Sequence, residues 1–334
     1  MHIAITGATG FLGSHLAEAF HQHGHHVTGV VRPSSTPNFL ESMGAHVQRA
    51  TLEDPATLRH AFSGADVVIH AAAKVHTHGR WSDFVRTTIE GTARTLEAAC
   101  AAGVHHFIHV STVGVYGFPK PGSPPFDESA GTGNIHRWNY YSRSKIEAER
   151  IARAAHDAGR IAVTILRPTW VYGPRDTTTL ARIVDALRRR RMKWIGDGTN
   201  RLSLVYATDV ARAFVLAATI PHARGQTYNI VADETSPTQR EFLQAICSLW
   251  DLPAPTGTMS YRTAYALGFA GECIAHWSGY RICPPLTRLT ALLFGGQRRF
   301  SGEKIRRELG WVPAVSFADG IRQVAAWYQT HGNP

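Results

Sequence analysis

A tyrosine and a lysine four residues apart, Tyr141 and Lys145, form the clearest catalytic pattern in the sequence. They open a predicted helix over residues 141–156, so their side chains share one helix face. An ammonium beside a phenol favours the phenolate and lowers the pKa of the tyrosine. A group that normally titrates near pH ~10 then becomes a usable proton donor and acceptor near neutral pH.

Two hydroxyl residues are expected beside this pair. Ser111 and Thr112 lie at the end of an apolar run, residues 106–111, that predicts a strand. In a parallel sheet the ligand lies at the carboxyl ends of the strands, so both hydroxyls would face a bound cofactor. The alternative is that they only cap or turn the chain.

A glycine-rich turn at the start of the chain is suited to binding phosphate. Gly7, Gly10 and Gly13 stand between a predicted strand over residues 2–5 and a predicted helix over residues 12–21. Glycine lets the backbone approach a pyrophosphate, and the helix N-terminus supplies N–H donors and a positive dipole end. We therefore predict a dinucleotide site here; the alternative is a tight structural turn.

The type of dinucleotide depends on the end of the next strand, residues 27–31. An acidic residue there would bind the ribose 2′-hydroxyl and repel a 2′-phosphate. The strand instead runs into Arg32, with no Asp or Glu near it. We hypothesise that Arg32 pairs with the 2′-phosphate of NADP. The alternative is that Arg32 stacks on adenine or points to water and that the cofactor is NAD.

The elements that must position these residues form an α/β pattern. Predicted strands alternate with predicted helices, which is typical of a Rossmann-type doubly wound parallel sheet. The strands are predicted at residues 2–5, 27–31, 46–50, 66–73, 106–111 and 161–166. We expect an NAD(P)-binding domain over residues 1–175, with contributions from about 200–232, and a smaller, mainly substrate-binding region over residues 176–334.

Composition narrows the class of protein. The 334 residues are 44% hydrophobic, which supports a full core, and the net charge is +10. The four cysteines form no CxxC pair, so neither a disulfide framework nor a metal site is predicted, which fits a cytoplasmic protein. No signal peptide and no nucleic-acid module is indicated. The basic run at residues 188–193 is either a solvated helix end or a contact with an anionic membrane.

The C-terminal third is apolar and aromatic, above all at residues 261–279 and 285–295. Arg262, Glu272 and several glycines make the first segment a poor membrane span. One interpretation is protein core or the wall of a substrate pocket. The other is an apolar lid near a membrane or a lipid-like substrate.

Together these motifs resemble the extended short-chain dehydrogenase/reductase family, within the NAD-dependent epimerase/dehydratase superfamily. The resemblance implies that Tyr141 is the general acid/base and that Lys145 binds the nicotinamide ribose. It places Thr112 at the catalytic serine position, with Ser111 as its neighbour. The motifs are Thr6-Gly-Ala-Thr-Gly-Phe-Leu-Gly13, His70-Ala-Ala-Ala73, Val110-Ser-Thr-Val-Gly-Val-Tyr-Gly117, Tyr141-x-x-x-Lys145, Leu166-Arg-Pro-Thr-Trp-Val-Tyr-Gly-Pro174 and Gly196-Asp-Gly198.

The resemblance also implies a set of cofactor contacts along the strand ends. They are Gly7, Thr9, Gly10, Phe11, Leu12, Gly13, Arg32, Leu52, Ala71, Ala72, Ala73, Ser111, Tyr141, Lys145, Pro168, Thr169 and Val171. Two departures stand out. Ala50 and Thr51 precede Leu52 where the family often has Gly-Asp, and Thr88 replaces a family asparagine.

The branch of the family is indicated by a missing arginine. Sugar-nucleotide enzymes of the family carry Arg-Asp where this chain has Leu202 and Ser203, and Arg201 stands one place early. On a strand, one place turns a side chain to the other face, so the phosphate clamp is expected to be absent. The region from Pro284 to Gly320 instead resembles the 3β-hydroxysteroid dehydrogenase-like branch.

Our leading hypothesis is therefore an NAD(P)-dependent oxidoreductase that interconverts a hydroxyl and a ketone on a hydrophobic substrate, steroid-, terpenoid- or β-keto-acyl-like. Two alternatives stay open: a sugar-nucleotide epimerase or dehydratase, and a non-catalytic NADP-binding regulator. A homodimer and a peripheral contact of this cytoplasmic protein with a membrane are further hypotheses about partners.

Overall fold

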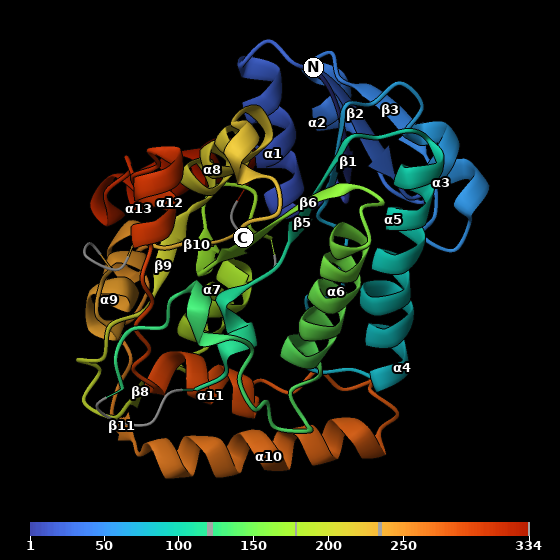
Figure 1. Ribbon diagram of the computed structural model, residues 1–334. Helices are drawn as coiled ribbons and strands as arrows, with labels where there is room; N and C mark the ends of the chain where they lie inside the picture. The colour runs from blue at the N-terminus through green and yellow to red at the C-terminus, as the bar shows by residue number, and fades with distance from the viewer. Residues whose placement is uncertain (119–122, 178, 233–235, 333–334) are drawn as a thin grey trace.

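The computed structural model describes residues 1–118, 123–177, 179–232 and 236–332. Its centre is a seven-stranded sheet in the order β10-β6-β5-β4-β1-β2-β3, with every neighbouring pair parallel (Figure 1). This arrangement confirms the predicted Rossmann-type doubly wound sheet. The strands are β1 (His2–Thr6), β2 (His26–Val31), β3 (His46–Arg49), β4 (Val67–His70), β5 (His106–Val110), β6 (Ala162–Pro168) and β10 (Thr227–Ile230).

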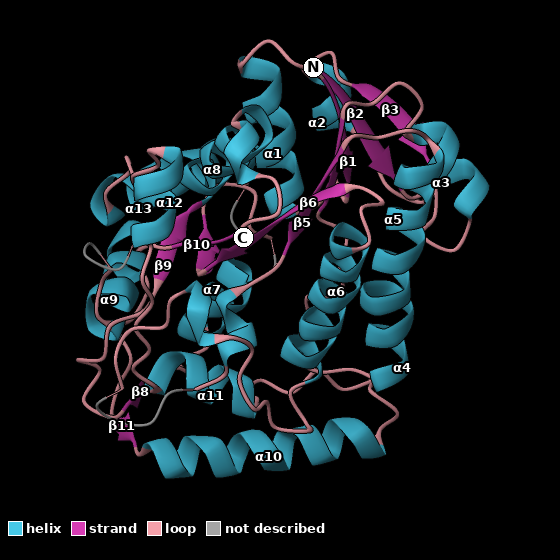
Figure 2. Cartoon of the chain, in the orientation of Figure 1, coloured by secondary structure: helices cyan, strands magenta, loops and turns pink. Residues whose placement is uncertain are grey.

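Helices cover both faces of the sheet (Figure 2). Strand residues alternate between the two faces, so Ile3 and Ile5 belong to one core and Ala4 to the other. The first face is covered by α1 (Phe11–Gln22) and α8 (Ala207–Thr219). The second is covered by α3 (Pro55–Ala61), α5 (Gly91–Ala101) and α6 (Tyr140–Asp157).

Most element boundaries lie within a few residues of the prediction, but two differ in a way that matters for the site. The fourth strand ends at His70, so Ala71–Ala73 begin a loop rather than end a strand. The helical segment that follows this loop is not a continuous α-helix: it consists of α4 (Trp81–Phe84), a π-helical segment (Val85–Glu90) and α5. Thr88, at the family asparagine position, lies in that π-helical segment.

The C-terminal part of the chain has its own apolar core. It is built by α7 (Thr179–Arg188), α9 (Gln239–Leu249), α11 (Arg288–Gly295) and α13 (Phe317–His331). Two short parallel strand pairs lie outside the main sheet: β7 (Trp170–Tyr172) with β9 (Leu204–Tyr206), and β8 (Trp194–Ile195) with β11 (Thr258–Met259). No helix begins at Leu204. Residues 204–206 instead form β9, because their buried side chains pack beside β7, and α8 begins only at Ala207.

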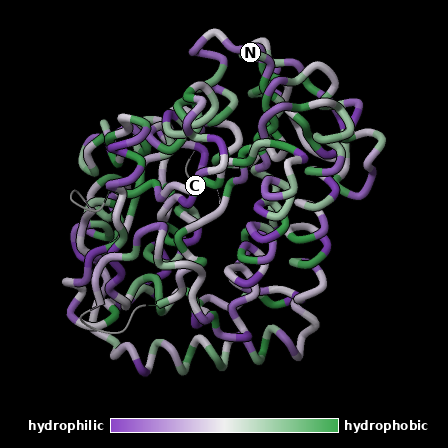
Figure 3. The backbone as a smooth tube through the Cα atoms, in the orientation of Figure 1, coloured by the Kyte–Doolittle hydropathy of each residue, from purple (hydrophilic) through white to green (hydrophobic). Residues whose placement is uncertain are grey.

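Helix α10 (Tyr261–Trp277) runs along one edge of the molecule, at the bottom of Figure 1, and packs on α11. Only Ala264, Gly268 and Ala275 of this helix are buried. Leu267 is 50% exposed and Trp277 is 87% exposed. Figure 3 shows hydrophobic segments along this outlying helix. Protein core is therefore the wrong interpretation for its outer side chains.

The shorter elements are α2 (Asn38–Ser42), α12 (Glu303–Leu309) beside β10, and a 3₁₀ turn (Val113–Tyr116) directly after Thr112. Two more 3₁₀ turns lie at Glu128–Ala130 and Pro221–Ala223. Among the described residues no helix is long and apolar enough to cross a membrane.

Candidate active site

The site lies where the central strands end. Because β1, β4, β5 and β6 are parallel neighbours, the residues that follow them meet at one edge of the sheet. That edge brings together the glycine turn after β1, Ala71–Ala73 after β4, Ser111 and Thr112 after β5, and Thr169 after β6. Sequence segments more than a hundred residues apart thus form one site.

The glycine turn leaves no room for side chains. Gly7 has a positive φ of 71°, and a Cβ there would lie 2.9 Å from the Ala72 nitrogen. A Cβ on Gly13 would lie 2.1 Å from the Gly7 oxygen. Helix α1 begins at Phe11, and its N-cap residue, Gly10, makes no side-chain capping bond. These residues fit a dinucleotide pyrophosphate, which needs a close backbone approach and an open helix N-terminus.

Tyr141 lies in the first turn of α6, whose start is fixed by Asn139. The Asn139 carboxamide oxygen accepts a 3.2 Å bond from the Ser142 N–H, so it caps the helix. The Thr112 hydroxyl oxygen accepts from the Gly114 N–H at 3.1 Å, which leaves its own proton free to bond the Tyr141 phenol. The structure therefore places the predicted hydroxyl where it acts on the pKa of the predicted acid/base.

The electrostatics of Tyr141 differ from the sequence expectation. Burial raises the pKa of Tyr141 to about 12, and the hydrogen bond with Thr112 opposes that rise only in part. Lys145 does not lower this pKa, because its ammonium donates a 2.7 Å bond to the Val110 carbonyl oxygen instead. The expectation that Lys145 lowers the pKa of Tyr141 was wrong for this state of the protein. At neutral pH the phenol keeps its proton and is set to act as a proton donor.

Lys145 is itself strongly affected by its surroundings. Burial lowers the pKa of the Lys145 ammonium to about 8, and the carboxylate of Glu149, one helical turn further on, raises it in part. The side chain is 3% exposed and emerges beside the end of β5. It therefore lies where it could reach a ligand that occupies the strand ends.

Ser111 is held by a buried ionic network that we did not predict. Its hydroxyl donates to Glu149 Oε1 at 2.5 Å, and Arg167 pairs with both carboxylate oxygens of Glu149. Arg167 also donates to the Tyr116 phenol at 2.7 Å, and Tyr116 donates to Asn229. The Ser111 hydroxyl is thus a fixed point of the scaffold, while Thr112 faces Tyr141.

His70 is a second residue whose role the sequence did not reveal. Its ring bonds Thr6 Oγ1 at 2.8 Å and Thr92 Oγ1 at 3.1 Å, so it links β1, β4 and α5 behind the cofactor edge. Burial, assisted by the charge of Lys145, lowers the pKa of His70 to about 3. It stays neutral and acts as a hydrogen-bonding link between strands.

The other predicted cofactor residues occupy the same edge to different degrees. Thr9 is exposed, Phe11 and Leu12 open α1, and Val171 lies in β7. Pro168 ends β6, and the next residue, Thr169, is buried with a hydroxyl that has no partner among the described residues. An orphaned hydroxyl at a strand end suits a bound ligand.

At the adenosine end the structure is more open. Arg32 is exposed beyond the end of β2, and its turn is braced by Arg49, which donates to the Pro33 carbonyl at 2.8 Å. Leu52 packs beside Gly91 at the start of α5. Arg32 is thus available to a ligand, whereas Leu52 contributes an apolar surface.

The structure shows how the residues at the expected position of the sugar-nucleotide clamp are arranged. Leu202 is 1% exposed and belongs to the C-terminal core. Arg201 donates instead to the Ser236 carbonyl at 2.6 Å. Position 202 therefore carries no charge, and Arg201 is exposed with its Nη1 directed to Ser236.

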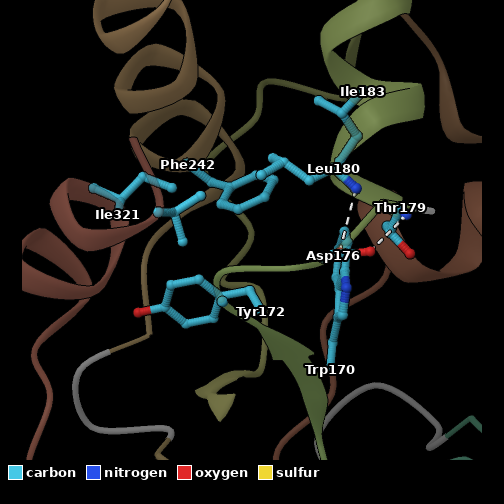
Figure 4. Close-up of a pocket in the computed structure, with 10 residues that line it drawn as sticks. Trp170, Tyr172, Asp176, Thr179, Leu180, Ile183, Phe242 and Ile321 are labelled. Atoms are coloured by element: carbon cyan, nitrogen blue, oxygen red, sulfur yellow. Dashed lines mark hydrogen bonds between the residues drawn. The ribbon is translucent and has the colours of Figure 1, made fainter. Parts of the chain in front are cut away.

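A small apolar pocket lies in the C-terminal part, away from these residues (Figure 4). Trp170, Tyr172 and Phe242 form its aromatic wall, and Leu180 and Ile321 lie around them. Neither Thr112, Tyr141 nor Lys145 lines it, so the pocket is a packing feature of that core and not the reaction site. Within the described residues no group of three or more His, Cys, Asp or Glu side chains could hold a metal ion.

Known proteins were compared with the whole chain. The model of the NAD dependent epimerase/dehydratase family matches residues 3–231. The 2-alkyl-3-oxoalkanoate reductase of Stenotrophomonas maltophilia is 32% identical, over 98% of this chain and 99% of that protein. The 4-hydroxy-2-methyl-3-oxo-4-farnesyl-3,4-dihydroquinoline-1-oxide ketoreductase of Stigmatella aurantiaca is 28% identical, over 96% and 95%.

Among solved structures, the UDP-glucuronic acid 4-epimerase of Bacillus cereus, in complex with UDP-glucuronic acid and NAD, superimposes with a TM-score of 0.76. The two chains are 23% identical, and the match covers 99% of this chain and all of that one (100%). This likeness shows a shared fold.

Proposed function

Because the chain belongs to the NAD-dependent epimerase/dehydratase family and is an NAD-dependent oxidoreductase of the extended short-chain dehydrogenase/reductase type, we propose that it interconverts a hydroxyl and a ketone on a hydrophobic substrate. One observation carries the proposal. The protonated phenol of Tyr141 bonds Thr112 at the strand ends, with the Lys145 ammonium one helical turn away.

In the proposed reaction each of these side chains has a distinct task. Thr112 donates a hydrogen bond to the substrate oxygen, which stabilises negative charge as it develops there. Tyr141 gives that oxygen a proton in the reductive direction and takes it back in the oxidative one. Lys145 leaves the Val110 carbonyl to bind the ribose of the cofactor. When bound, the nicotinamide supplies or accepts the hydride.

The substrate class rests on two supports. The reductase of S. maltophilia and the ketoreductase of S. aurantiaca are named for keto substrates that carry alkyl or farnesyl groups. In this chain the position of the sugar-nucleotide clamp is filled by the buried Leu202. A 2-alkyl-3-keto compound with apolar chains is therefore our preferred substrate, ahead of steroid and terpenoid ketones.

NADP is the cofactor that we favour over NAD. Arg32 stands exposed at the end of β2, with Arg49 holding the same turn and no carboxylate at the strand end. A guanidinium there would pair with a 2′-phosphate, which NAD lacks.

The direct test is a cofactor-oxidation assay. Purified protein would be given NADPH or NADH with 2-alkyl-3-keto esters, steroid ketones, terpenoid ketones or UDP-sugars. We expect turnover with the alkyl keto compounds and NADPH. Epimerisation of a UDP-sugar without net cofactor oxidation, and no turnover of any apolar ketone, would overturn the proposal in favour of the sugar-nucleotide alternative.

A further inference from the structure

Four basic side chains gather in the loop after β4 and on the helix opposite it. Lys74, His76 and His78 lie in the loop that joins β4 to α4, and Arg182 lies on α7. The rings of His76 and His78 are 6.1 Å apart. Arg182 acts electrostatically on both histidines, as does Lys74, so the two elements lie close enough for their charges to interact.

No anion balances this cluster. Within the part of the chain that the structure describes, no carboxylate pairs with Lys74, His76, His78 or Arg182. Burial and the neighbouring cations lower the pKa of both histidines. Near neutral pH the positive charge of the cluster is therefore carried by Lys74 and Arg182, and a bound anion would offset the cost of bringing these groups together.

Unsatisfied polar atoms point to the same place. The Thr77 hydroxyl and His78 Nδ1 are both buried, and neither has a hydrogen-bond partner among the described residues. Buried polar atoms in a folded protein normally find a partner, so those that do not are candidates for contact with a ligand. Arg182 keeps one bond, from its guanidinium to the Pro284 carbonyl at 3.1 Å, which orients it.

The cluster lies beside the reaction site. The loop after β4 follows the strand that lies between β1 and β5, so it starts at the cofactor edge. It leads into Trp81, whose ring is 5.4 Å from that of Tyr140, the residue before Tyr141. The loop thus runs from the cofactor edge to the first turn of α6, in which Tyr141 lies.

We propose that Lys74, His76, His78 and Arg182 bind the carboxylate of a substrate that also carries the reacting ketone or hydroxyl, as in a 3-keto or 3-hydroxy acid. The inference rests on the proposed function and adds an anionic group to its apolar substrate. The planar guanidinium of Arg182 matches a carboxylate, and the neutral or protonated imidazoles can donate to it. The other source of the same chemistry is a phosphate of the cofactor, since Lys74 lies next to Ala71–Ala73.

The test compares an acid with its ester. The oxidative direction is preferable, because 3-keto acids lose carbon dioxide in solution. Wild-type protein, Arg182→Gln and the control Arg188→Gln, an exposed arginine on the same helix, would be assayed with NADP⁺ and a 2-alkyl-3-hydroxy acid or its methyl ester. Binding of the unreactive 2-alkyl acid without the hydroxyl would be measured by calorimetry on the same proteins.

We expect the wild type to prefer the acid, and Arg182→Gln to lower kcat/KM for the acid by about 10- to 100-fold, as for loss of a hydrogen bond to a charged group. For Arg182→Gln, the rate with the ester and the KM for NADP⁺ should stay within about twofold of the wild-type values, and Arg188→Gln should resemble the wild type.

Equal use of acid and ester by the wild type would overturn the inference but leave the proposed function intact. A raised KM for NADP⁺ with an unchanged acid preference would assign the cluster to the cofactor phosphate. Calorimetric binding that is equal in wild type and Arg182→Gln would also overturn it, whether or not turnover is found.

A different observation concerns the outer face of α10. Most exposed side chains of this helix are apolar or small, among them Leu267, Ala270, Ile274 and Trp277. Its exposed polar residues are Arg262, Thr263 and His276. The only carboxylate of α10, Glu272, is turned inward and pairs with Arg288 on α11. A solvent-facing helix without outward carboxylates and with exposed large apolar residues is typical of a surface that meets a partner.

Positive charge flanks this face. Exposed arginines at residues 188–191 and the exposed Lys193 precede β8, which pairs with β11 directly before α10 begins. Arg262 lies in the first turn of the helix, and Arg281 follows its end. Apolar side chains in the middle with cations around them are the pattern of a helix that lies in the surface of an anionic membrane.

We infer that α10 is an interfacial helix that docks this face on an anionic lipid bilayer. The test is co-sedimentation of the protein with two kinds of vesicle. One is made of phosphatidylcholine alone, and the other is phosphatidylcholine with about one third phosphatidylglycerol, an anionic lipid. We expect the wild type to bind only the anionic vesicles, and salt to weaken this binding. The double variant Leu267→Gln with Ile274→Gln should bind them at least tenfold more weakly. Its melting temperature and its turnover of a soluble substrate should stay unchanged. Failure of the wild type to bind anionic vesicles would overturn the inference. It would also be overturned if light scattering showed a wild-type dimer that the double variant no longer forms, while vesicle binding stayed the same. That second result would assign the face to another copy of the chain.

Discussion

Lys145 donates a 2.7 Å hydrogen bond to the carbonyl oxygen of Val110, the last residue of β5. The bond holds a charged amine against the strand end that is followed by Ser111 and Thr112. Because the amine is buried there, the pKa of Lys145 falls to about 8. The same position that would allow Lys145 to serve a cofactor therefore makes the protein without cofactor less stable.

Replacing this lysine should stabilise the fold. The charged form is disfavoured in the folded state, where the pKa of Lys145 is about 8 instead of the ordinary 10.5. The cost of charging Lys145 is thus fully present below pH 8, shrinks between pH 8 and 10.5, and is absent above. At about 1.4 kcal/mol per pKa unit, Lys145→Met should raise the free energy of unfolding at pH 7 by about 3–4 kcal/mol.

Urea unfolding of the cofactor-free protein at pH 7 and pH 10 would measure this gain, with Lys193→Met as the exposed control. We expect the gain to be smaller at pH 10, and catalytic activity to be lost at both. A Lys145→Met variant that is less stable than the wild type at pH 7 would show that the bond to Val110 outweighs the burial of the charge.

The pair formed by Glu149 and Arg167 should be essential to folding rather than to chemistry. Both side chains are 4% exposed, so Glu149→Gln leaves the Arg167 charge buried without its counter-ion. We expect a loss of about 3–5 kcal/mol in the free energy of unfolding, and a much smaller loss when Glu149→Leu is combined with Arg167→Met. Glu147→Gln, on the same helix but 43% exposed, is the control and should change stability by less than about 0.5 kcal/mol. Equal stability of Glu149→Gln and Glu147→Gln would contradict the assigned role.

The glycine turn gives a prediction about cofactor binding. A methyl group at Gly13 would be 2.1 Å from the Gly7 oxygen, whereas one at Gly10 would be 3.1 Å from the same atom. Gly13→Ala should therefore abolish cofactor binding, measured by quenching of tryptophan fluorescence, and lower the melting temperature. Gly10→Ala should be tolerated better in the fold. Normal NADPH affinity in Gly13→Ala would refute the proposed phosphate site.

Arg32 decides between the two dinucleotides. If its guanidinium pairs with a 2′-phosphate, Arg32→Ala should lower kcat/KM for NADPH by about 10- to 100-fold and leave the value for NADH unchanged. Arg59→Ala, an exposed arginine on α3, serves as the control. The assignment to NADP would be contradicted by a wild-type enzyme that prefers NADH and by an Arg32→Ala variant with the same preference.

The parts of the fold that followed from the sequence are those that local pattern determines. Strands buried on both faces appear as apolar runs, and the turn after β1 needs glycines for reasons that the backbone alone supplies. The pair β7 and β9 could not be found in this way, because each three-residue strand is defined only by its partner. Periodicity likewise marked residues 261–279 as apolar but could not say that Trp277 faces outward.

The site shows the same limit. The four-residue spacing placed Tyr141 and Lys145 on one helix face, but not the direction of the ammonium, which the Val110 carbonyl determines. The pairing of Glu149 with Arg167 joins a helix to a strand, so no local pattern announces it. Glu149 could have been noticed as the next residue after Lys145 on the same face, four positions on.

The role of Tyr141 is tested most directly by comparing Tyr141→Phe with Tyr140→Phe, since the two tyrosines are neighbours and Tyr140 packs against Trp81. Single-turnover reduction of a 2-alkyl-3-keto substrate would be measured with saturating NADPH, alongside NADPH affinity. We predict that Tyr141→Phe reduces the hydride-transfer rate by about 10²- to 10⁴-fold with unchanged NADPH affinity, and that Tyr140→Phe keeps near wild-type rates. A Tyr141→Phe enzyme that reduces the ketone at the wild-type rate would contradict the account.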